Sequence, residues 1–295
     1  MRLITCGYHG QIHLGAVEGE TAILPALAGT AGLDMLGLIE AGPPHWRRFA
    51  AELAGSPPRC RVALEEVNLL APIPRPRKNI LCLGWNYADH AAESLAAHGR
   101  EPVLPEHSVV FTKAVTSVTG PTADIVLDEA VTTQLDWEVE LAVIIGRGGR
   151  RIAAEHALEH VFGYTVVNDL SARDLQFRHK QYFLGKSLDG ACPMGPWIVT
   201  ADEIADPQQL DLRCWVNGEL MQAANSRQQI FLIAETIAVL SRGMSLEPGD
   251  IIATGTPAGV GFARTPPQFL RAGDVVECEV EGIGRLSNRI VAGSG

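Results

Sequence analysis

Short apolar runs separated by Gly, Pro and Asn turns dominate the chain after residue 78 and predict a protein rich in strands. The predicted strands cover residues 80–83, 108–112, 138–145, 161–168, 196–200, 210–216, 250–254, 274–280 and 284–291. The clearest helix is predicted at residues 229–242, with Gly243 as its C-cap. One stripe of this helix is apolar: Ile230, Ile233, Ile237 and Leu240. Because strands predominate and helices are irregularly placed, we expect an α+β fold on a mixed sheet.

The first 70 residues have a different pattern. Strand-like runs at 3–5 and 11–17 precede two helical stretches near 30–41 and 45–54. Residues 70–78 are rich in proline, as in a stiff linker or an extended connection. We therefore expect a small N-terminal α+β accessory domain at residues 1–70 and a larger domain at residues 71–295.

Charge and composition restrict the partners of the protein. The formal net charge of −10 argues against nucleic acid and anionic membranes as partners. No apolar run approaches the roughly 20 residues of a spanning helix, and the N-terminus lacks the apolar core of a signal peptide, so a cytoplasmic protein is expected. The six cysteines form no C-x-x-C pair and are expected to be reduced, packed thiols.

Two acidic residues, Glu138 and Glu140, interrupt a strand that otherwise consists of core-type residues. Side chains two apart on a strand share a face, and two buried carboxylates repel unless a cation lies between them. The alternative is a solvated face of an antiparallel strand. A further acid, Asp169, ends the apolar run 161–167. Three carboxylates favour a hard divalent cation, Mg²⁺ or Mn²⁺, with Ca²⁺ as an alternative occupant.

A histidine and an acid lie three residues apart in the segment 87–98, which is expected to be a short helix. On one helix face, Glu93 can orient the imidazole of His90 and raise its basicity, which makes the pair a candidate general base. The alternative is an exposed histidine beside an unrelated acid. His156 and His160 have the i, i+4 spacing of a zinc pair, but their polar surroundings favour a solvated helix.

Other polar residues follow the predicted acidic cluster. Arg173 and Gln176 come just after Asp169; Arg173 can grip a carboxylate, or it can form an internal ion pair with Asp136 or Asp174. Cys192 is a weak candidate nucleophile, because the sequence places no histidine beside it.

Several ordered motifs together resemble the fumarylacetoacetate hydrolase family, and most closely its bacterial members that act on acylpyruvates and related 2-oxo acids. The motifs are Asn86-Tyr87-x-x-His90-x-x-Glu93, Glu138-x-Glu140, Asn168-Asp169-x-x-Ala172-Arg173-Asp174, Gly185-Lys186-x-x-Asp189 and Thr254-Gly255-Thr256-Pro257-x-Gly259-Val260-Gly261. The resemblance runs from about Pro72 to the C-terminus and implies a catalytic domain of layered mixed sheets that forms a homodimer.

The resemblance also implies roles for particular residues. His90 and Glu93 would belong to a mobile lid and activate water, while Lys186 would lie near the metal and stabilise negative charge on a substrate oxygen. Gly255 and Thr256 would bind the substrate carboxylate, in a glycine-rich loop that can also be a tight turn. The expected substrate is a small anionic 2-oxo acid.

Because both a base and a metal site are expected, hydrolytic carbon–carbon cleavage of a 2,4-dioxo acid is favoured. Such an enzyme would convert an acylpyruvate or a fumarylpyruvate-like acid into pyruvate and a carboxylic acid. One alternative is an oxaloacetate-type decarboxylase, or a 2-oxo acid hydratase or isomerase of aromatic degradation. Another is a metal- and ligand-binding protein without catalysis.

Overall fold

The computed structural model describes residues 1–28, 32–101 and 103–293. Its helices are α1 (Met35–Ala41), α2 (Pro43–Ala54), α3 (Ala88–Ala97), α4 (Arg173–Arg178), α5 (Phe183–Lys186) and α6 (Ile233–Ser241). Its N-terminal strands are β1 (Arg2–Tyr8), β2 (Gln11–Glu18), β3 (Thr21–Ile23), β4 (Arg61–Ala63) and β5 (Asn68–Leu69). The later strands are β6 (Ile80–Gly84), β7 (Val109–Lys113), β8 (Val118–Thr119), β9 (Ile125–Leu127), β10 (Leu135–Asp136), β11 (Val139–Ile145), β12 (Val161–Asn168), β13 (Ser171–Ala172), β14 (Cys192–Thr200), β15 (Asp211–Val216), β16 (Glu219–Asn225), β17 (Ile251–Ala253), β18 (Val275–Val280) and β19 (Gly284–Ala292).

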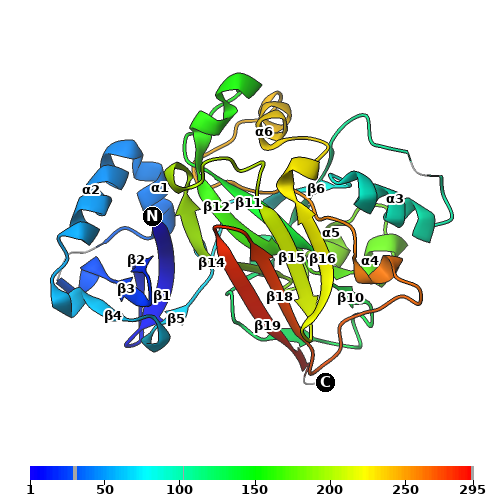
Figure 1. The fold of residues 1–295 in the computed structure, drawn as a ribbon, viewed down its shortest axis with the longest axis horizontal. Helices are drawn as coiled ribbons and strands as arrows, with labels where there is room; N and C mark the ends of the chain where they lie inside the picture. Colours follow the sequence, from blue (N-terminus) through cyan, green and yellow to red (C-terminus); the bar gives the residue numbers. More distant parts are fainter. Residues whose placement is uncertain (29–31, 102, 294–295) are drawn as a thin grey trace.

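A large mixed sheet runs through the whole molecule in the order β4-β3-β2-β1-β14-β12-β11-β17-β6-β7. A smaller sheet has the order β16-β15-β18-β19-β9, and its strands β15, β16, β18 and β19, yellow to red in Figure 1, lie over β11 and β12. The strand pair β10–β13 completes the described sheets. The expected α+β class of layered mixed sheets is confirmed.

The strand β11 is buried along its whole length because both faces of the large sheet are covered. Leu141 and Val143 belong to the core that it forms with the smaller sheet, whereas Ala142 and Ile144 belong to the core that also contains α1. Alternate side chains of one strand therefore pack into two cores, as the continuous apolar run in the sequence requires.

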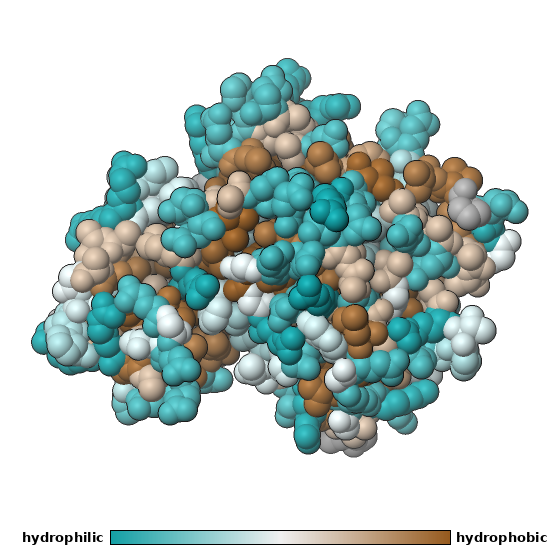
Figure 2. Space-filling view, in the orientation of Figure 1, coloured by the Kyte–Doolittle hydropathy of each residue, from teal (hydrophilic) through white to brown (hydrophobic). Residues whose placement is uncertain are grey.

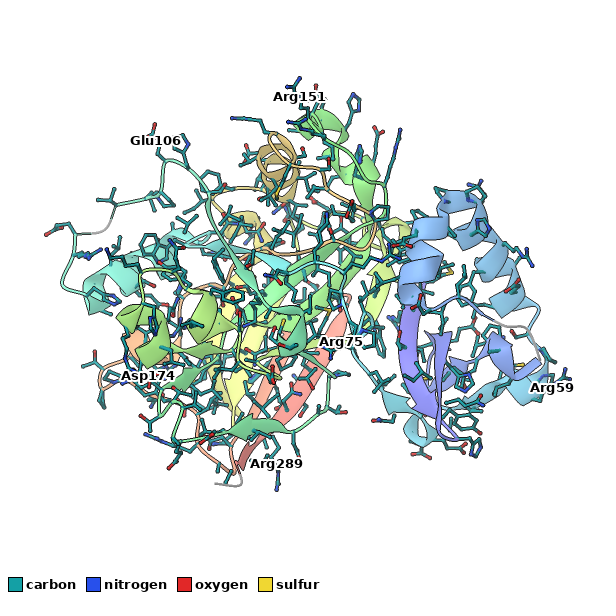
Figure 3. All side chains as sticks on the ribbon, turned by 180° about the vertical axis from the view of Figure 1, so that it is seen from behind. Arg59, Arg75, Glu106, Arg151, Asp174 and Arg289 are labelled. Carbon is teal, nitrogen blue, oxygen red and sulfur yellow. The ribbon has the colours of Figure 1, made fainter. Side chains whose placement is uncertain are left out.

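The N-terminal segment joins the large sheet rather than standing apart from it. Strand β1 pairs antiparallel with β14, placing Leu3 opposite Ile198, and the blue segment continues the sheet at one side of the molecule in Figure 1. In the proline-rich connection Ile73 is fully buried, and Arg75 lies where the two parts meet in Figure 3. A domain boundary at residue 70 stays a prediction.

The predicted helices agree with the structure except at their ends. The helix predicted at 30–41 begins at Met35, and residues 30 and 31 of that prediction lie outside the described residues. Residues 154–160 form a 3-10 helix. Among the described residues, no helix has the length and apolar character needed to cross a membrane.

The helix predicted at 229–242 is shorter, because tertiary contacts override the local pattern at its start. Asn86 accepts a hydrogen bond from the Phe231 amide at 2.8 Å and donates to the Phe231 carbonyl at 3.0 Å, which holds this stretch extended before α6 begins at Ile233. The helix ends with Arg242, rather than Gly243, as its C-cap.

The close packing of β12 against β14 predicts a specific sensitivity at Gly163. A Cβ added there would lie 2.3 Å from the Val199 carbonyl oxygen. We expect Gly163→Ala to lower the free energy of unfolding by about 1–3 kcal/mol. Urea denaturation measures this change. Gly243→Ala is the matched control, since nothing lies within 4 Å of its Cβ position, and equal losses in both variants would contradict the predicted packing.

Candidate active site

Three buried carboxylates meet at one end of the β11–β12 pair. Glu138 precedes β11, Glu140 is its second residue, and Asp169 directly follows β12. Pairing of Val139 with Asn168 brings these positions together, and one oxygen from each carboxylate lies within 4.8 Å of the other two. Their residues are 4%, 1% and 0% exposed, so the alternative of a solvated acidic face is wrong.

Two lysines surround the cluster. Lys186 Nζ donates to Glu138 Oε2 at 2.6 Å and to Asp169 Oδ2 at 2.8 Å, which places this lysine where the family resemblance implied. Lys113 Nζ lies 2.7 Å from Asp169 Oδ1 and is itself fully buried. Sequence analysis missed Lys113; the available signal was a lysine that ends an otherwise apolar strand.

The electrostatics of the cluster leave one carboxylate without a full counter-charge. Burial, together with the charges of Asp169 and Glu138, raises the pKa of Glu140 well above its ordinary value. Burial would also raise the pKa of Glu138, but the charges of Lys186 and Arg173 outweigh it and lower that pKa to about 2. A divalent cation among the three oxygens would favour the ionised form of Glu140. An all-oxygen donor set fits Mg²⁺ or Mn²⁺.

His90 and Glu93 form the predicted pair on α3. His90 Nδ1 lies 2.9 Å from Glu93 Oε1, and the His90 side chain is 8% exposed. The Gly259 amide donates to both Glu93 oxygens, at 3.1 and 2.9 Å, so the acid is held in place. With Glu93 accepting the Nδ1 proton, Nε2 of the ring is the nitrogen that can accept a proton.

A small cavity of about 50 Å³ brings the candidates together. It is lined by Leu83, Gly84, Trp85, His90, Ser94, His98, Phe111, Glu138, Arg173, Gln176, Phe177, Tyr182, Lys186, Thr256 and Phe262. The base, the lysine and one carboxylate of the cluster therefore line one cavity, and several of its other lining residues are aromatic.

The residues predicted to bind substrate have structural partners as well. Arg173 Nε donates to Asp136 Oδ2 at 2.8 Å, which is one of the internal pairs considered from the sequence, and Nη1 donates to Gln176 Oε1 at 2.9 Å. The Gly255 amide donates to Glu140 Oε2 at 2.8 Å. Thr256 Oγ1 donates to the Val139 carbonyl at 3.0 Å. Binding of substrate by these four residues stays a prediction.

The glycine at 255 is required by its surroundings. Its φ of +96° lies in the region that favours glycine, and an added Cβ would lie 2.8 Å from the Asn86 Cβ. This glycine therefore lets the backbone approach both the Asn86 turn and the Glu140 carboxylate.

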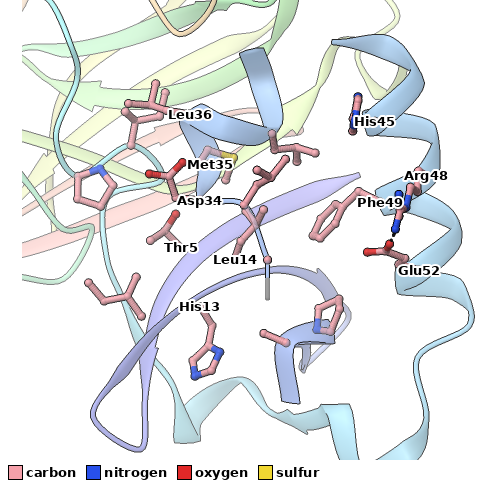
Figure 4. Close-up of a pocket in the computed structure, with 18 of the residues that line it drawn as sticks. Thr5, His13, Leu14, Asp34, Met35, Leu36, His45, Arg48, Phe49 and Glu52 are labelled. Carbon is pink, nitrogen blue, oxygen red and sulfur yellow. Dashed lines mark hydrogen bonds and ion pairs between the residues drawn. The ribbon is translucent and has the colours of Figure 1, made fainter. Parts of the chain in front are cut away.

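A larger cavity of about 820 Å³ lies in the N-terminal segment, lined by parts of β1, β2, α1 and α2. Several of its charged groups have partners: Arg48 pairs with Glu52, as Figure 4 shows, and Asp34 accepts a hydrogen bond from the Gly37 amide as the N-cap of α1. The described residues that line it include no cluster of acids that could hold a metal ion. We therefore place the chemistry in the smaller cavity.

The surroundings of Cys192 and His156 argue against the roles of nucleophile and zinc ligand that the sequence had raised for them. Burial raises the pKa of Cys192 to about 12, so its thiol is a poor nucleophile. His156 is exposed and pairs with Glu159 at 3.0 Å. Within the described part of the chain, the cluster of Glu138, Glu140 and Asp169 is the one that could hold a metal ion.

Residues 79–291 match the model of the fumarylacetoacetate (FAA) hydrolase C-terminal domain. The chain belongs to the fumarylacetoacetate hydrolase family. It is 55% identical over 228 residues to the oxaloacetate tautomerase YisK of Bacillus subtilis, covering 77% of this chain and 74% of that protein.

Solved structures of the family extend the likeness to the whole chain. The fumarylacetoacetate hydrolase of Exiguobacterium antarcticum is 41% identical, with a TM-score of 0.86 over 99% of this chain and 100% of that one. The maleylpyruvate hydrolase of Sphingobium, solved with manganese(II) and pyruvate, is 33% identical, with a TM-score of 0.80 over 100% of both chains. These relatives and the acidic cluster support an enzyme with a divalent metal ion.

The acidic cluster predicts metal-dependent stability. Mg²⁺ or Mn²⁺ at about 100 times its Kd should raise the Tm by about 5–10 °C, because it binds the folded state alone. Glu140→Gln should lower metal affinity by about 100-fold. The same variant should not destabilise the metal-free protein, since it removes a buried charge.

Thermal denaturation with and without metal, and metal titration by calorimetry, measure both effects. Glu219→Gln is the matched control, because the Glu219 side chain is 69% exposed. Wild-type metal affinity in Glu140→Gln would contradict the assignment of Glu140 as a ligand.

Proposed function

We propose that the protein is a Mg²⁺- or Mn²⁺-dependent enzyme that interconverts the enol and keto forms of oxaloacetate. The observation that carries this proposal is the position of His90, which is paired with Glu93 and lines the same small cavity as Glu138 and Lys186. The 55% identity to an oxaloacetate tautomerase supports the choice of substrate.

Glu138, Glu140 and Asp169 would hold the metal ion. When bound, the ion supplies a positive charge that binds the carboxylate and the C2 oxygen of a 2-oxo acid and favours charge on that oxygen. Lys186 adds a second positive charge beside the cluster. Lys113 keeps Asp169 oriented through its 2.7 Å contact.

The reaction requires one proton to move between C3 and the C2 oxygen. His90 Nε2 takes the proton from C3 of the keto form, and the electron pair of the C–H bond becomes the C2–C3 double bond of the enol. The electron pair of the C2 carbonyl double bond moves onto the C2 oxygen, which then receives the proton from Nε2 of His90, so the base is regenerated. Glu93 stabilises the protonated imidazole through its bond to Nδ1, and the Gly259 amide keeps Glu93 in place. In the reverse direction His90 returns the proton to C3.

Hydrolysis of an acylpyruvate is the second candidate. The same His90–Glu93 pair could activate water, and the maleylpyruvate hydrolase of Sphingobium has a similar fold. The sequence comparison favours the tautomerase, because the chain is 55% identical to an oxaloacetate tautomerase and 33% identical to the maleylpyruvate hydrolase. A decarboxylase would not need the base. The predicted homodimer and cytoplasmic location stay predictions.

Replacement of the base tests the proposal. His90→Gln should lower the rate of enol-to-keto conversion of oxaloacetate by about 10²–10⁴-fold, because the imidazole carries the proton that is delivered to C3 in this direction. The loss of ultraviolet absorbance of the enol measures this rate in the presence of Mg²⁺. Metal affinity should stay within about twofold of wild type.

His156→Gln is the control, since His156 is exposed and lies outside the cavity. Unchanged conversion in His90→Gln would remove the base assignment. Release of pyruvate from acetylpyruvate, with no effect on the enol of oxaloacetate, would instead support the hydrolase.

A further inference from the structure

The helix α3 presents more than the base to the cavity. His90, Ser94 and His98 are spaced i, i+4 and i+8, and all three line the cavity. Each step of four residues advances about 6 Å along a helix. One face of α3 therefore forms a row of polar groups that begins at the base and leads away from it.

Ser94 is a buried hydroxyl without a partner in the structure. The residue is 4% exposed, and its Oγ makes no hydrogen bond to any described residue. Leaving a buried donor unpaired costs about 1–3 kcal/mol, so such groups usually have a ligand or water to bind. Because Ser94 lines the cavity, a ligand in the cavity is the natural partner.

His98 is fixed at the rim beside Ser94. Its Nδ1 lies 2.8 Å from the Ser94 carbonyl oxygen and therefore donates to it. The ring packs edge-on against Phe177, with centroids 4.6 Å apart, and is tilted against Phe262 at 5.9 Å. Among the described residues Nε2 has no hydrogen-bond partner, and with both ring nitrogens carrying hydrogen it can donate a hydrogen bond to an anion.

The charges along the cavity favour an anion at this end. Glu138 is the one carboxylate among the described residues that line the cavity, and it belongs to the metal cluster. Glu93 is occupied by His90 and the Gly259 amide. The guanidinium of Arg173 lies 4.5 Å from the centre of the Phe262 ring, the same ring that His98 contacts. No acid in the cavity lining competes for Ser94 or His98.

We propose that Ser94 and His98 bind the far carboxylate of a four-carbon 2-oxo dicarboxylic acid and so determine specificity for it. This inference rests on the proposed function. If His90 acts on C3, a carboxylate bonded to C3 lies within a few ångströms of the base, and Ser94 follows the base by about one helical turn. Helical side chains lean toward the N-terminus, which brings the His98 ring over the turn of Ser94. A 2-oxo acid with an apolar far end would leave both groups unpaired.

A pair of stable ligands tests the far-carboxylate site without catalysis. Malate and lactate share the 2-hydroxy acid end, and malate has in addition the far carboxylate. Calorimetric titration in Mn²⁺ should show that wild type binds malate at least about 10-fold more tightly than lactate. Ser94→Ala and His98→Phe should each reduce the preference for malate by about 10-fold and leave the affinity for lactate unchanged. Ser94→Thr keeps a hydroxyl and should retain the preference for malate.

His98→Phe retains an aromatic ring beside Phe177 and Phe262. A loss of the preference for malate in this variant is therefore caused by removal of the ring nitrogens and not by a change in packing. His107→Ala is the control for an exposed histidine elsewhere on the chain. Equal affinities for malate and lactate in wild type, no malate binding, or an undiminished preference in Ser94→Ala would overturn the proposal.

Turnover separates this proposal from the proposed function. If wild type does not convert the enol of oxaloacetate, yet the malate preference is lost on substitution, the far-carboxylate site stands and the tautomerase fails. If oxaloacetate is converted while the preference is unaffected by both substitutions, the tautomerase stands and the site fails.

Discussion

Burial of three carboxylates in one place is the constraint on which the rest of the site depends. Ionised groups taken out of water need counter-charges, and Glu138, Glu140 and Asp169 are almost fully covered. Lys186 and Lys113 supply two positive charges by direct contact. The raised pKa of Glu140 indicates that these positive charges do not fully balance the three carboxylates. A divalent cation among the carboxylates would provide the missing positive charge.

The layered fold makes this burial achievable. Because β11 is covered by one core on each face, its backbone is held rigidly and can present acids at one end without moving. Helix α3 places His90 in the cavity that Glu138 also lines, and the Gly259 amide holds Glu93 by hydrogen bonds. Hydrophobic residues lie at the surface in the region of α3 in Figure 2, and Val103 and Leu104 of the following loop are exposed.

Short-range patterns in the sequence predicted much of the site, because the relevant geometry is local. Glu138 and Glu140 are two apart on a strand, and His90 and Glu93 are three apart on a helix, so their faces follow from backbone periodicity alone. Most longer strands of both sheets were also predicted from apolar runs, but β3, β4, β9 and β16 were not, and β14 begins at Cys192, earlier than its pattern indicated.

Long-range contacts account for what the sequence could not show. Lys113 reaches Asp169 across 56 positions of the chain, and no pattern in the sequence indicated this contact. The extended stretch before α6 depends on Asn86, far away in sequence. That the buried Ser94 hydroxyl lacks a hydrogen-bond partner among the described residues can be recognised only from the folded structure.

The most direct test is the location of a metal ion in crystals of this protein grown with Mn²⁺. Anomalous scattering should show one strong peak within bonding distance of oxygens from Glu138, Glu140 and Asp169. A peak elsewhere, or carboxylates that keep their contacts with Lys186, Lys113 and Arg173 and bind no ion at saturating Mn²⁺, would contradict the account.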